Sequence, residues 1–315
     1  MNFGSAHSSN VFNFATEQAR AIVFLHYGVL AVCVVIGLLV AALLAVAAIR
    51  FRARDEAEVP EQSPGNLKLE VTWTVIPALI LCVLGGLTAY VMSIVNPPLR
   101  ERTPDVIVVA HQWWWEYRYP KTGVVTANEL YLPEGTDCLL EIRSADVDHC
   151  FWVPNFGQKM DAIPGRSNHL FIKPMKRGLY LGACSEFCGA DHALMRIVSQ
   201  VVTPQEFESW TNRQLKQPSA AADAAAQSGR SLFMSRNCVS CHAIAGTQAK
   251  GDTGPDLTHV SQRMSLGAGV VQNNLTSLTD WIEDAQTFKP GCHMMKMRLK
   301  PGEAHDIAVY LESLQ

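Results

Sequence analysis

The sequence carries little charge. Asp, Glu, Lys and Arg make up 17% of its 315 residues, against about 25% in an average soluble protein. The 26 basic and 29 acidic residues nearly balance, so no basic surplus exists to hold a polyphosphate backbone. This composition excludes a disordered, highly charged protein, and we expect no nucleic-acid partner. The 9 cysteines are an odd number, which excludes a purely disulfide-stapled framework.

Two long stretches lack charge altogether. Neither 21–49 nor 71–95 contains Asp, Glu, Lys or Arg. A membrane-spanning helix needs about 20 apolar residues. A buried helix of a soluble protein can be equally apolar, but two such runs favour a transmembrane hairpin and hence contact with membrane lipid.

The flanking charges predict the orientation of this hairpin. One basic residue, Arg20, precedes the first run, whereas the loop between the runs carries Arg50, Arg52, Arg54 and Lys68. Basic loops stay in the cytoplasm. The charge follows the first apolar run instead of preceding it, so a cleaved signal peptide is disfavoured. Both termini, and everything after the hairpin, should therefore lie outside the cytoplasm.

The rest of the chain predicts two domains and a linker. From Asp105 onward, short alternating runs such as DVIVVA and RIVSQVV are separated by turn clusters, which indicates an antiparallel sandwich or barrel. A small-residue stretch, QPSAAADAAAQS, indicates a linker, and the remainder is compositionally helical. The predicted division is 1–99 for the N-terminal segment and hairpin, 100–216 for the β domain, 217–228 for the linker and 229–315 for the helical domain.

The sequence Cys238-Val-Ser-Cys241-His242 is the strongest motif. Two thiols at this spacing can form thioethers to one haem, and the adjacent histidine can then ligate the iron. A disulfide or half a zinc site is the plainer interpretation, but zinc would need a second Cys or His pair nearby. The motif predicts covalent haem c.

A second motif, Cys184-Ser-Glu-Phe-Cys188-Gly-Ala-Asp-His192-Ala-Leu-Met195, combines thiolates, an imidazole and a thioether. This soft ligand set favours copper or zinc, and a thioether is a typical axial ligand of copper. Two cysteines suggest two metals with bridging thiolates, which requires a second histidine. His149 is a suitable candidate. A disulfide beside a core methionine is the alternative.

Four segments together resemble a known family: LEVTWTVIP, HQWWWEYRY, SADVDHCFWVPNFGQKMDAIPGR and CSEFCGADHALM. They are similar to subunit II of haem–copper cytochrome c oxidases, and the C-terminal domain resembles a fused cytochrome c, as in the caa type. The resemblance implies a two-helix transmembrane hairpin, an all-β cupredoxin-like Greek-key sandwich and a small all-α class I cytochrome c domain.

The resemblance also implies a ligand set. A binuclear copper centre would be held by two histidines, two cysteines, a methionine and a backbone carbonyl, and the Glu186 side chain would also contact a magnesium ion at the boundary with subunit I. The implied copper ligands are His149, Cys184, Glu186 through its carbonyl, Cys188, His192 and Met195.

The distal haem ligand is less clear from the sequence. The segment KPGCHM resembles the methionine loop of bacterial class I cytochromes c and indicates Met294, but the usual proline does not follow it. Met297 and His293 therefore remain rivals. The segment GPDL, with Pro255, resembles the loop whose proline carbonyl bonds the proximal histidine, and the C-terminal segment GEAHDIAVYLESL resembles a helix that packs across the first helix of that domain.

Two further residues have two interpretations each. Trp113 aligns with a tryptophan through which electrons enter the copper domain, but one of three consecutive tryptophans on a strand should also pack in the core. Glu70 opens the second span, where an acid favours the helix N-terminus; the resemblance instead suggests the entrance of a proton path. No function is predicted for Cys138, Cys150 and Cys292, although Cys150 beside His149 is unexpected.

The predicted function is electron transfer in an aerobic respiratory oxidase of the bacterial inner membrane. Electrons would pass from a donor through haem c and the copper pair to subunit I, which reduces oxygen, coupled to proton translocation. Expected partners are subunits I and III, with cytochrome c or a membrane quinol-oxidising complex as donor. The alternative is a membrane-anchored copper and haem carrier that serves another periplasmic reductase; a quinol-oxidase scaffold would lack the thiolates.

Overall fold

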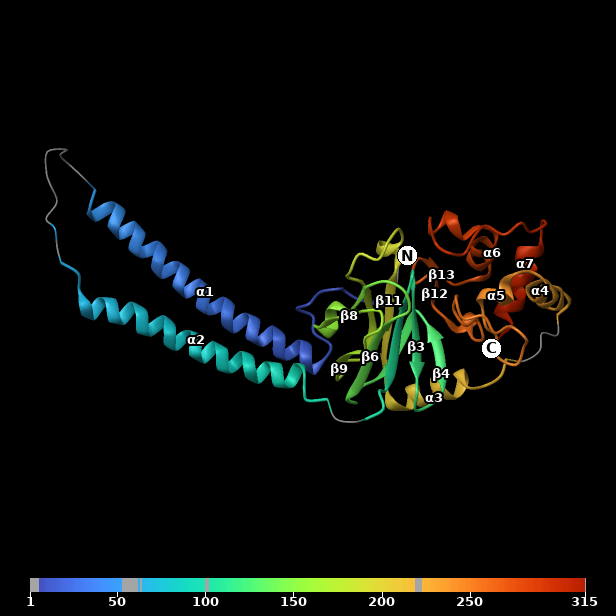
Figure 1. Cartoon of the computed structure of the whole chain (residues 1–315), viewed down its shortest axis with the longest axis horizontal. Helices are drawn as coiled ribbons and strands as arrows, with labels where there is room; N and C mark the ends of the chain where they lie inside the picture. Colours follow the sequence, from blue (N-terminus) through green and yellow to red (C-terminus); the bar gives the residue numbers. More distant parts are fainter. Residues whose placement is uncertain (1–5, 53–61, 63, 100–101, 219–222, 315) are drawn as a thin grey trace. The chain divides into compact units, whose positions relative to one another are not determined.

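The structure, a computed structural model, describes residues 6–52, 62, 64–99, 102–218 and 223–314 (Figure 1). The chain divides into two compact units. One is the hairpin, 20–98, and the other combines 1–19 with 99–315. Each unit is described by itself.

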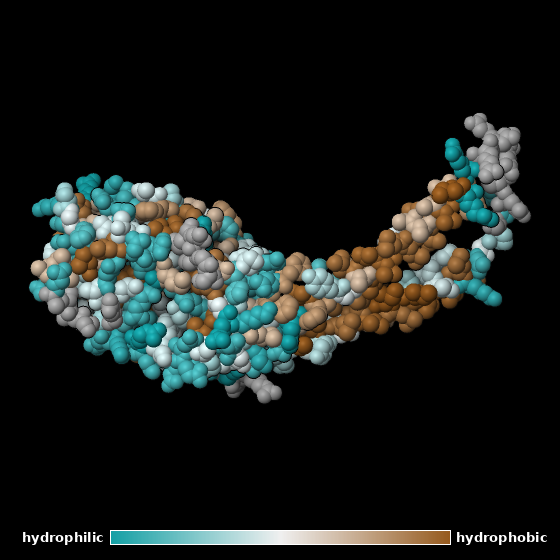
Figure 2. Space-filling view, turned by 180° about the vertical axis from the view of Figure 1, so that it is seen from behind, coloured by the Kyte–Doolittle hydropathy of each residue, from teal (hydrophilic) through white to brown (hydrophobic). Residues whose placement is uncertain are grey.

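The hairpin unit is built from two long helices, α1 (Glu17–Arg50) and α2 (Leu67–Val95). They contain 34 and 29 residues. At about 1.5 Å per residue, each exceeds the ~30 Å hydrocarbon thickness of a bilayer. Both are long and apolar enough to cross a membrane, and Figure 2 shows apolar side chains over their outer surface. A surface this apolar is stable in lipid, not in water.

The second unit contains a β-sandwich. One sheet has the strand order β5-β11-β10-β7-β8, with β1 added beside β10, and the other has the order β4-β3-β2-β6-β9. Large side chains that lie fully buried fill the core of this domain, among them Trp115, Tyr117, Phe151 and Tyr180. The strands are β1 (Ala6–His7), β2 (Val106–His111), β3 (Trp114–Tyr119), β4 (Val124–Ala127), β5 (Glu129–Pro133), β6 (Cys138–Ser144), β7 (His149–Trp152), β8 (Lys159–Ala162), β9 (Asn168–Ile172), β10 (Gly178–Cys184) and β11 (Arg196–Val202).

The sandwich is not wholly antiparallel, and in this respect the sequence-based expectation is wrong. β2 pairs with β6, and β5 pairs with β11, in parallel. Parallel partners need long crossover connections, and a single strand's alternation carries no information about its partner's direction. Both parallel pairs join strands that are not consecutive in the chain.

The N-terminal segment is fastened to the sandwich. The buried Asn155 side chain donates from Nδ2 to the carbonyls of Ser8, Asn10 and Asn13, and β1 adds to β10. Asn155 lies in the 3₁₀ helix η1 (Pro154–Phe156). This attachment adds a short parallel strand beside β10, an inner strand of the sheet, and gave no signal in the sequence.

A helix leads out of the sandwich. α3 (Pro204–Gln214) begins with a capping box in which Thr203 accepts from the Glu206 amide and Glu206 accepts in return. The backbone N–H groups of Thr203 and Glu206, which have no partner within the helix, are thus both hydrogen-bonded. Trp210 packs back onto Tyr131 of β5, with ring centroids 4.4 Å apart. The last turn of α3 therefore stays close to the sandwich.

The C-terminal domain is small and helical. Its core lies between α4 and α7, where Phe233 packs near Tyr310. At Gly229 a Cβ would come within 1.9 Å of the Asp306 carbonyl oxygen, so only glycine permits this helix crossing. The elements are α4 (Ala224–Ser235), α5 (Cys238–Cys241), η3 (Val260–Gln262), β12 (Ser265–Leu266), β13 (Val271–Gln272), α6 (Leu275–Asp284), η4 (Ala285–Thr287) and α7 (Glu303–Glu312).

The expected crossing of the C-terminal helix over the first helix of this domain is confirmed by α4 and α7. α4 begins at Ala224, inside the segment 217–228 that the sequence predicts as a linker. Its alanines favour helix, and Asp306 of α7 accepts a hydrogen bond from Ser228. Within that segment, 219–222 lie outside the described residues. The domain limits themselves remain predictions.

Candidate metal centre and haem-binding domain

The first histidine of the cluster, His149, opens β7 and is fully buried. Its Nε2 lies 2.8 Å from Asp146 Oδ1, and its Nδ1 lies 3.9 Å from Cys184 Sγ. Burial alone would lower the pKa of His149, but the hydrogen bonds and negative charges of Asp146 and Cys184 together outweigh burial and raise it to about 8. A carboxylate on one ring nitrogen leaves the other directed at a metal, as in many metal sites.

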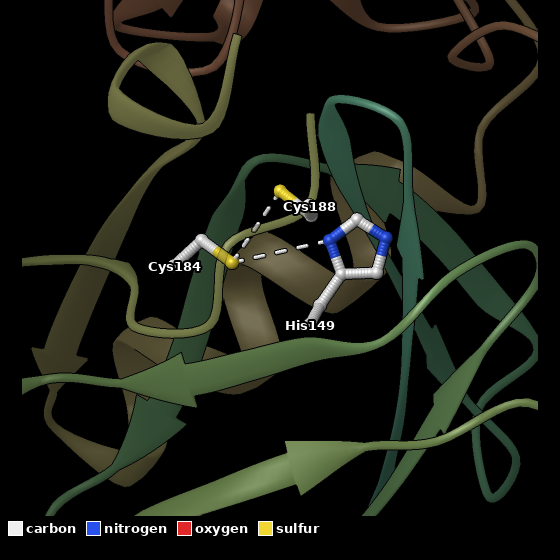
Figure 3. A group of neighbouring side chains, drawn as sticks. All are labelled: His149, Cys184 and Cys188. Atoms are coloured by element: carbon white, nitrogen blue, oxygen red, sulfur yellow. Dashed lines mark hydrogen bonds between the residues drawn. The ribbon is translucent and has the colours of Figure 1, made fainter. Parts of the chain in front are cut away.

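Cys184 ends β10, Cys188 lies on the loop that follows it, and His192 begins the 3₁₀ helix η2 (His192–Leu194). Figure 3 shows the Cys184 and Cys188 thiols beside the His149 ring. Cys184 Sγ lies 3.8 Å from Cys188 Sγ, and Cys188 Sγ lies 3.6 Å from His192 Nδ1. A disulfide requires about 2.05 Å between sulfurs, so both are free thiols. The ligand atoms of His149, Cys184 and Cys188 all lie within 4.8 Å of one another.

The remaining predicted copper ligands border the same loop. Met195, fully buried, directly precedes β11, and its carbonyl accepts from the Cys184 amide at 3.1 Å. The Glu186 carbonyl oxygen lies 3.2 Å from Cys184 Sγ, while the Glu186 side chain is exposed. The fold thus gathers all these residues around one loop, although their roles as ligands remain predictions.

The contact between the two thiols shifts their pKa values in opposite directions. The hydrogen bond from Cys188 holds the pKa of Cys184 well below its usual range. The same contact raises the pKa of Cys188. Two cysteines, two histidines and a methionine, all buried except the half-buried His192, fit soft metals such as copper.

Trp113 contacts this loop directly. Its Nε1 donates to the Cys188 carbonyl at 2.9 Å, and Gln112 Nε2 donates to the same oxygen at 2.7 Å. Gly189, at φ 115°, lies so close that a Cβ there would come within 2.9 Å of the Trp113 ring. Trp113, Trp114 and Trp115 are all buried, Trp115 completely, so the core-packing interpretation holds for Trp113 as well. Trp113 is placed to reach the cluster, and its role in accepting electrons stays a prediction.

The Cys-Val-Ser-Cys-His motif forms the short helix α5. His242 Nδ1 lies 2.8 Å from the Pro255 carbonyl oxygen, which confirms the expected contact with the GPDL loop. Burial lowers the pKa of His242, so the ring is neutral and its Nε2 remains available for iron. At Gly254 a Cβ would come within 2.7 Å of that ring. Thiols at i and i+3 beside an oriented neutral imidazole fit covalent haem.

The methionine loop is organised by Gln286. Its Nε2 donates to the carbonyls of Cys292 and Met294, both at 2.8 Å, and its Oε1 accepts from the Gly291 amide. Met295 is 73% exposed. Met294 and Met297 are both half-buried, so the choice of distal ligand remains a prediction.

Glu70 and Cys150 complete the residues expected from the sequence. Glu70 lies in the first turn of α2, whose N-cap is Asn66, so both of its interpretations remain open. Cys150 is buried in β7 and pairs with Asp161 on β8. Successive strand residues face opposite sides, so the Cys150 thiol points away from the face that carries His149.

Sequence reasoning missed several residues that support the cluster. Asp146 orients His149, and its place three residues earlier in SADVDH was a signal that could have been used. Asp191 is buried beside His192, and Lys289 is buried on the methionine loop. Neither of these gave a local signal, because an isolated charge in a sequence is usually solvated.

Fold and site together define a class: membrane-anchored redox proteins that join a cupredoxin-like metal domain to a covalent haem domain. The family described as cytochrome c oxidase subunit II, transmembrane domain, matches residues 6–90. The family described as cytochrome c oxidase subunit II, periplasmic domain, matches residues 121–202. The cytochrome c family matches residues 226–315.

Curated relatives agree over most of their length. The chain is 33% identical to "Cytochrome c oxidase subunit 2" of Alkalihalophilus pseudofirmus over 76% of this chain and 71% of the relative. It is 32% identical to the protein of the same name in Bacillus subtilis over 85% of this chain and 81% of the relative. The chain belongs to the cytochrome c oxidase subunit II family, in a form that carries a cytochrome c domain.

A solved structure also matches the chain. The periplasmic domain of subunit II of cytochrome oxidase from Bradyrhizobium japonicum is 35% identical, covers 36% of this chain and 95% of that chain, and gives a TM-score of 0.34.

Proposed function

We propose that this chain passes electrons from a donor, by way of haem c and a binuclear copper centre, to subunit I of an aerobic respiratory oxidase. Its family supports an electron-transfer role in the oxidase. The coupling of this transfer to proton translocation is part of the proposal. The observation that carries it is the cluster of His149, Cys184 and Cys188, in a chain that also holds the Cys238-to-His242 haem motif.

The protein's own residues supply order at the site. Bound copper and haem c would each supply a one-electron couple. Asp146 fixes the His149 ring, and the exclusion of water from Cys184, Cys188 and Met195 limits solvent rearrangement when charge changes. Trp113 contacts His293 of the haem domain and donates a hydrogen bond to the Cys188 carbonyl of the copper domain. In this proposal oxygen is reduced in subunit I, and no residue of this chain is catalytic.

Several finer assignments accompany the proposal. The exposed Glu186 side chain would help hold magnesium at the boundary with subunit I. The apolar surface of α1 and α2 would face membrane lipid and subunit I, and subunit III completes the complex. The redox domains and both termini would lie on the periplasmic side of a bacterial inner membrane. The donor would be a cytochrome c or a membrane quinol-oxidising complex.

Purification of the assembled complex tests this function. We expect a multi-span haem a protein to co-purify, with two coppers and one covalent haem c per chain, and oxygen consumption when the haem c is reduced. A chain that purifies with full metal content but without a haem a protein would favour the alternative, a membrane-anchored carrier for another periplasmic reductase.

A further inference from the structure

Lys289 is a buried lysine between the haem domain and the sandwich. It follows η4 on the chain, and only 3% of its surface is exposed. Its Nζ donates to the carbonyls of Trp113 at 2.6 Å, Leu194 at 3.0 Å and Gly267 at 3.3 Å. An ammonium has three N–H donors, so every donor is used.

The three acceptors come from both domains. Trp113 lies between β2 and β3, and Leu194 lies on the metal-binding loop in η2 (His192–Leu194), so two of them belong to the sandwich. Gly267, the third, follows β12 in the haem domain. A buried ammonium is costly unless it is fully hydrogen-bonded, and only the docked arrangement of the two domains satisfies it.

A buried carboxylate, Asp191, interacts electrostatically with this charge. Asp191 is 1% exposed, and its oxygens have no hydrogen-bond partner among the described residues. Burial lowers the pKa of Lys289 to about 8, and the negative charge of Asp191 opposes that change. Asp191 acts on Lys289 through its charge alone, because no hydrogen bond joins the two side chains among the described residues.

The loop held by Lys289 also touches Trp113 through a second residue. The His293 ring lies with its centroid 5.1 Å from that of Trp113. Gly291 lies so close to the metal-binding loop that a Cβ would come within 3.1 Å of the Ala190 side chain. His293, the residue before Met294, thus contacts Trp113. Trp113 in turn donates a hydrogen bond to the Cys188 carbonyl.

Other contacts between the domains lie elsewhere. The buried Glu129 carboxylate accepts from the amides of Met264 and Ser265, and the Arg196 amide donates to the Ala268 carbonyl. These bonds can keep the domains associated without Lys289. None of them touches Trp113.

We propose that Lys289 is a positioning residue that holds the methionine loop against Trp113 and thereby sets the rate of electron transfer from the haem domain to the copper domain. This rests on the proposed function. Electron transfer falls steeply with the distance between donor and acceptor. Loss of one contact that fixes this distance therefore slows transfer without altering either metal site.

The test is Lys289→Met in the full chain within the assembled complex, with Lys296→Met as the matched control. Lys296 lies on the same loop but is exposed and pairs with Asp284. After rapid reduction of haem c, we expect the copper pair of the Lys289 variant to be reduced more slowly by about tenfold or more. Both metal spectra should stay as in the unmodified protein, and the control should transfer at the unmodified rate.

A readout independent of the metals accompanies the kinetics. Amide hydrogen exchange across 264–268 and at Arg196 should quicken in the Lys289 variant and not in the control, because the docked state opens more often. An unchanged transfer rate in the Lys289 variant, beside a transferring unmodified protein, would overturn the proposal for Lys289 alone. Absence of haem-to-copper transfer in the unmodified protein would instead overturn the proposed function.

Solvent viscosity supplies a measurement that does not depend on the variant folding. If the domains react in the docked arrangement, transfer in the unmodified protein is independent of added glycerol. A rate that falls in proportion to viscosity would mean that a search precedes transfer, and the positioning role of Lys289 would be refuted.

Discussion

At the residue scale, the metal-binding loop depends on sulfur at two positions. Cys184 and Cys188 lie 3.8 Å apart, close enough to share metal ions, and a hydroxyl is a poor substitute for a bridging thiolate. His149 and His192 each approach a different sulfur. This arrangement matches a pair of metals held between two thiolates.

Replacement of Cys188 by serine should therefore leave at most one altered copper per chain. The purple colour and the multi-line paramagnetic signal of a shared electron should disappear, as measured by metal analysis and electron paramagnetic resonance. Cys150→Ser is the control, since that thiol points away from the face that carries His149, and it should retain two coppers. A Cys188 variant with an unaltered multi-line signal would show that the thiolates do not bridge.

The distal haem ligand is the second question at this scale. Met294→Leu should abolish the weak sulfur-to-iron absorption band at the red edge of the visible spectrum and lower the haem potential, because thioether ligation raises it. Met297→Leu serves as the comparison and should keep the band. If the two results are exchanged, the ligand is Met297.

At the element scale, the haem domain relies on the crossing of α4 and α7. The two helices meet at Gly229, where the backbone of α7 occupies the space of a Cβ. The Phe233 and Tyr310 rings pack nearby. A side chain at this position would force the helices apart.

We expect Gly229→Ala to destabilise the haem domain by about 1–3 kcal/mol, the usual cost of overpacking a close contact. Thermal unfolding followed through the haem absorbance would measure it. Ser231→Ala, an exposed change on the same helix, should have little effect. Equal melting temperatures for the two variants would contradict the close crossing.

At the scale of the whole molecule, the haem domain is attached both by the chain and by contacts. Lys289 and Glu129 link it to the sandwich through buried bonds. The association is therefore intramolecular, with an effective concentration of about millimolar or more. Haem-to-copper transfer should depend only weakly on salt, because it does not need long-range electrostatic steering.

Deletion of residues 217–315 tests the order of transfer. The copper domain and the membrane hairpin should remain intact, and oxygen consumption should then require an added soluble donor. The spectrum of the copper pair is the control for folding. Turnover with the native donor at the full rate would mean that the haem domain is not the obligatory first acceptor.

The sequence by itself determined the features that depend on neighbouring residues. The uncharged runs of α1 and α2 follow from composition, and the haem motif around Cys238 follows from two thiols and a histidine on one helical turn. The soft ligand set around Cys184 is equally local. Such signals are readable because the groups that interact are close in the chain.

Only the tertiary structure decided the contacts between distant segments. It paired β5 with β11 in parallel, brought His149 to Cys184, and buried Lys289 against the carbonyl of Trp113. No local pattern encodes such contacts, because the stability of each depends on desolvation and hydrogen bonding that exist only after the domains pack. Lys289 is the clearest case, because the sequence predicts an exposed charge and burial follows only when both domains surround the side chain.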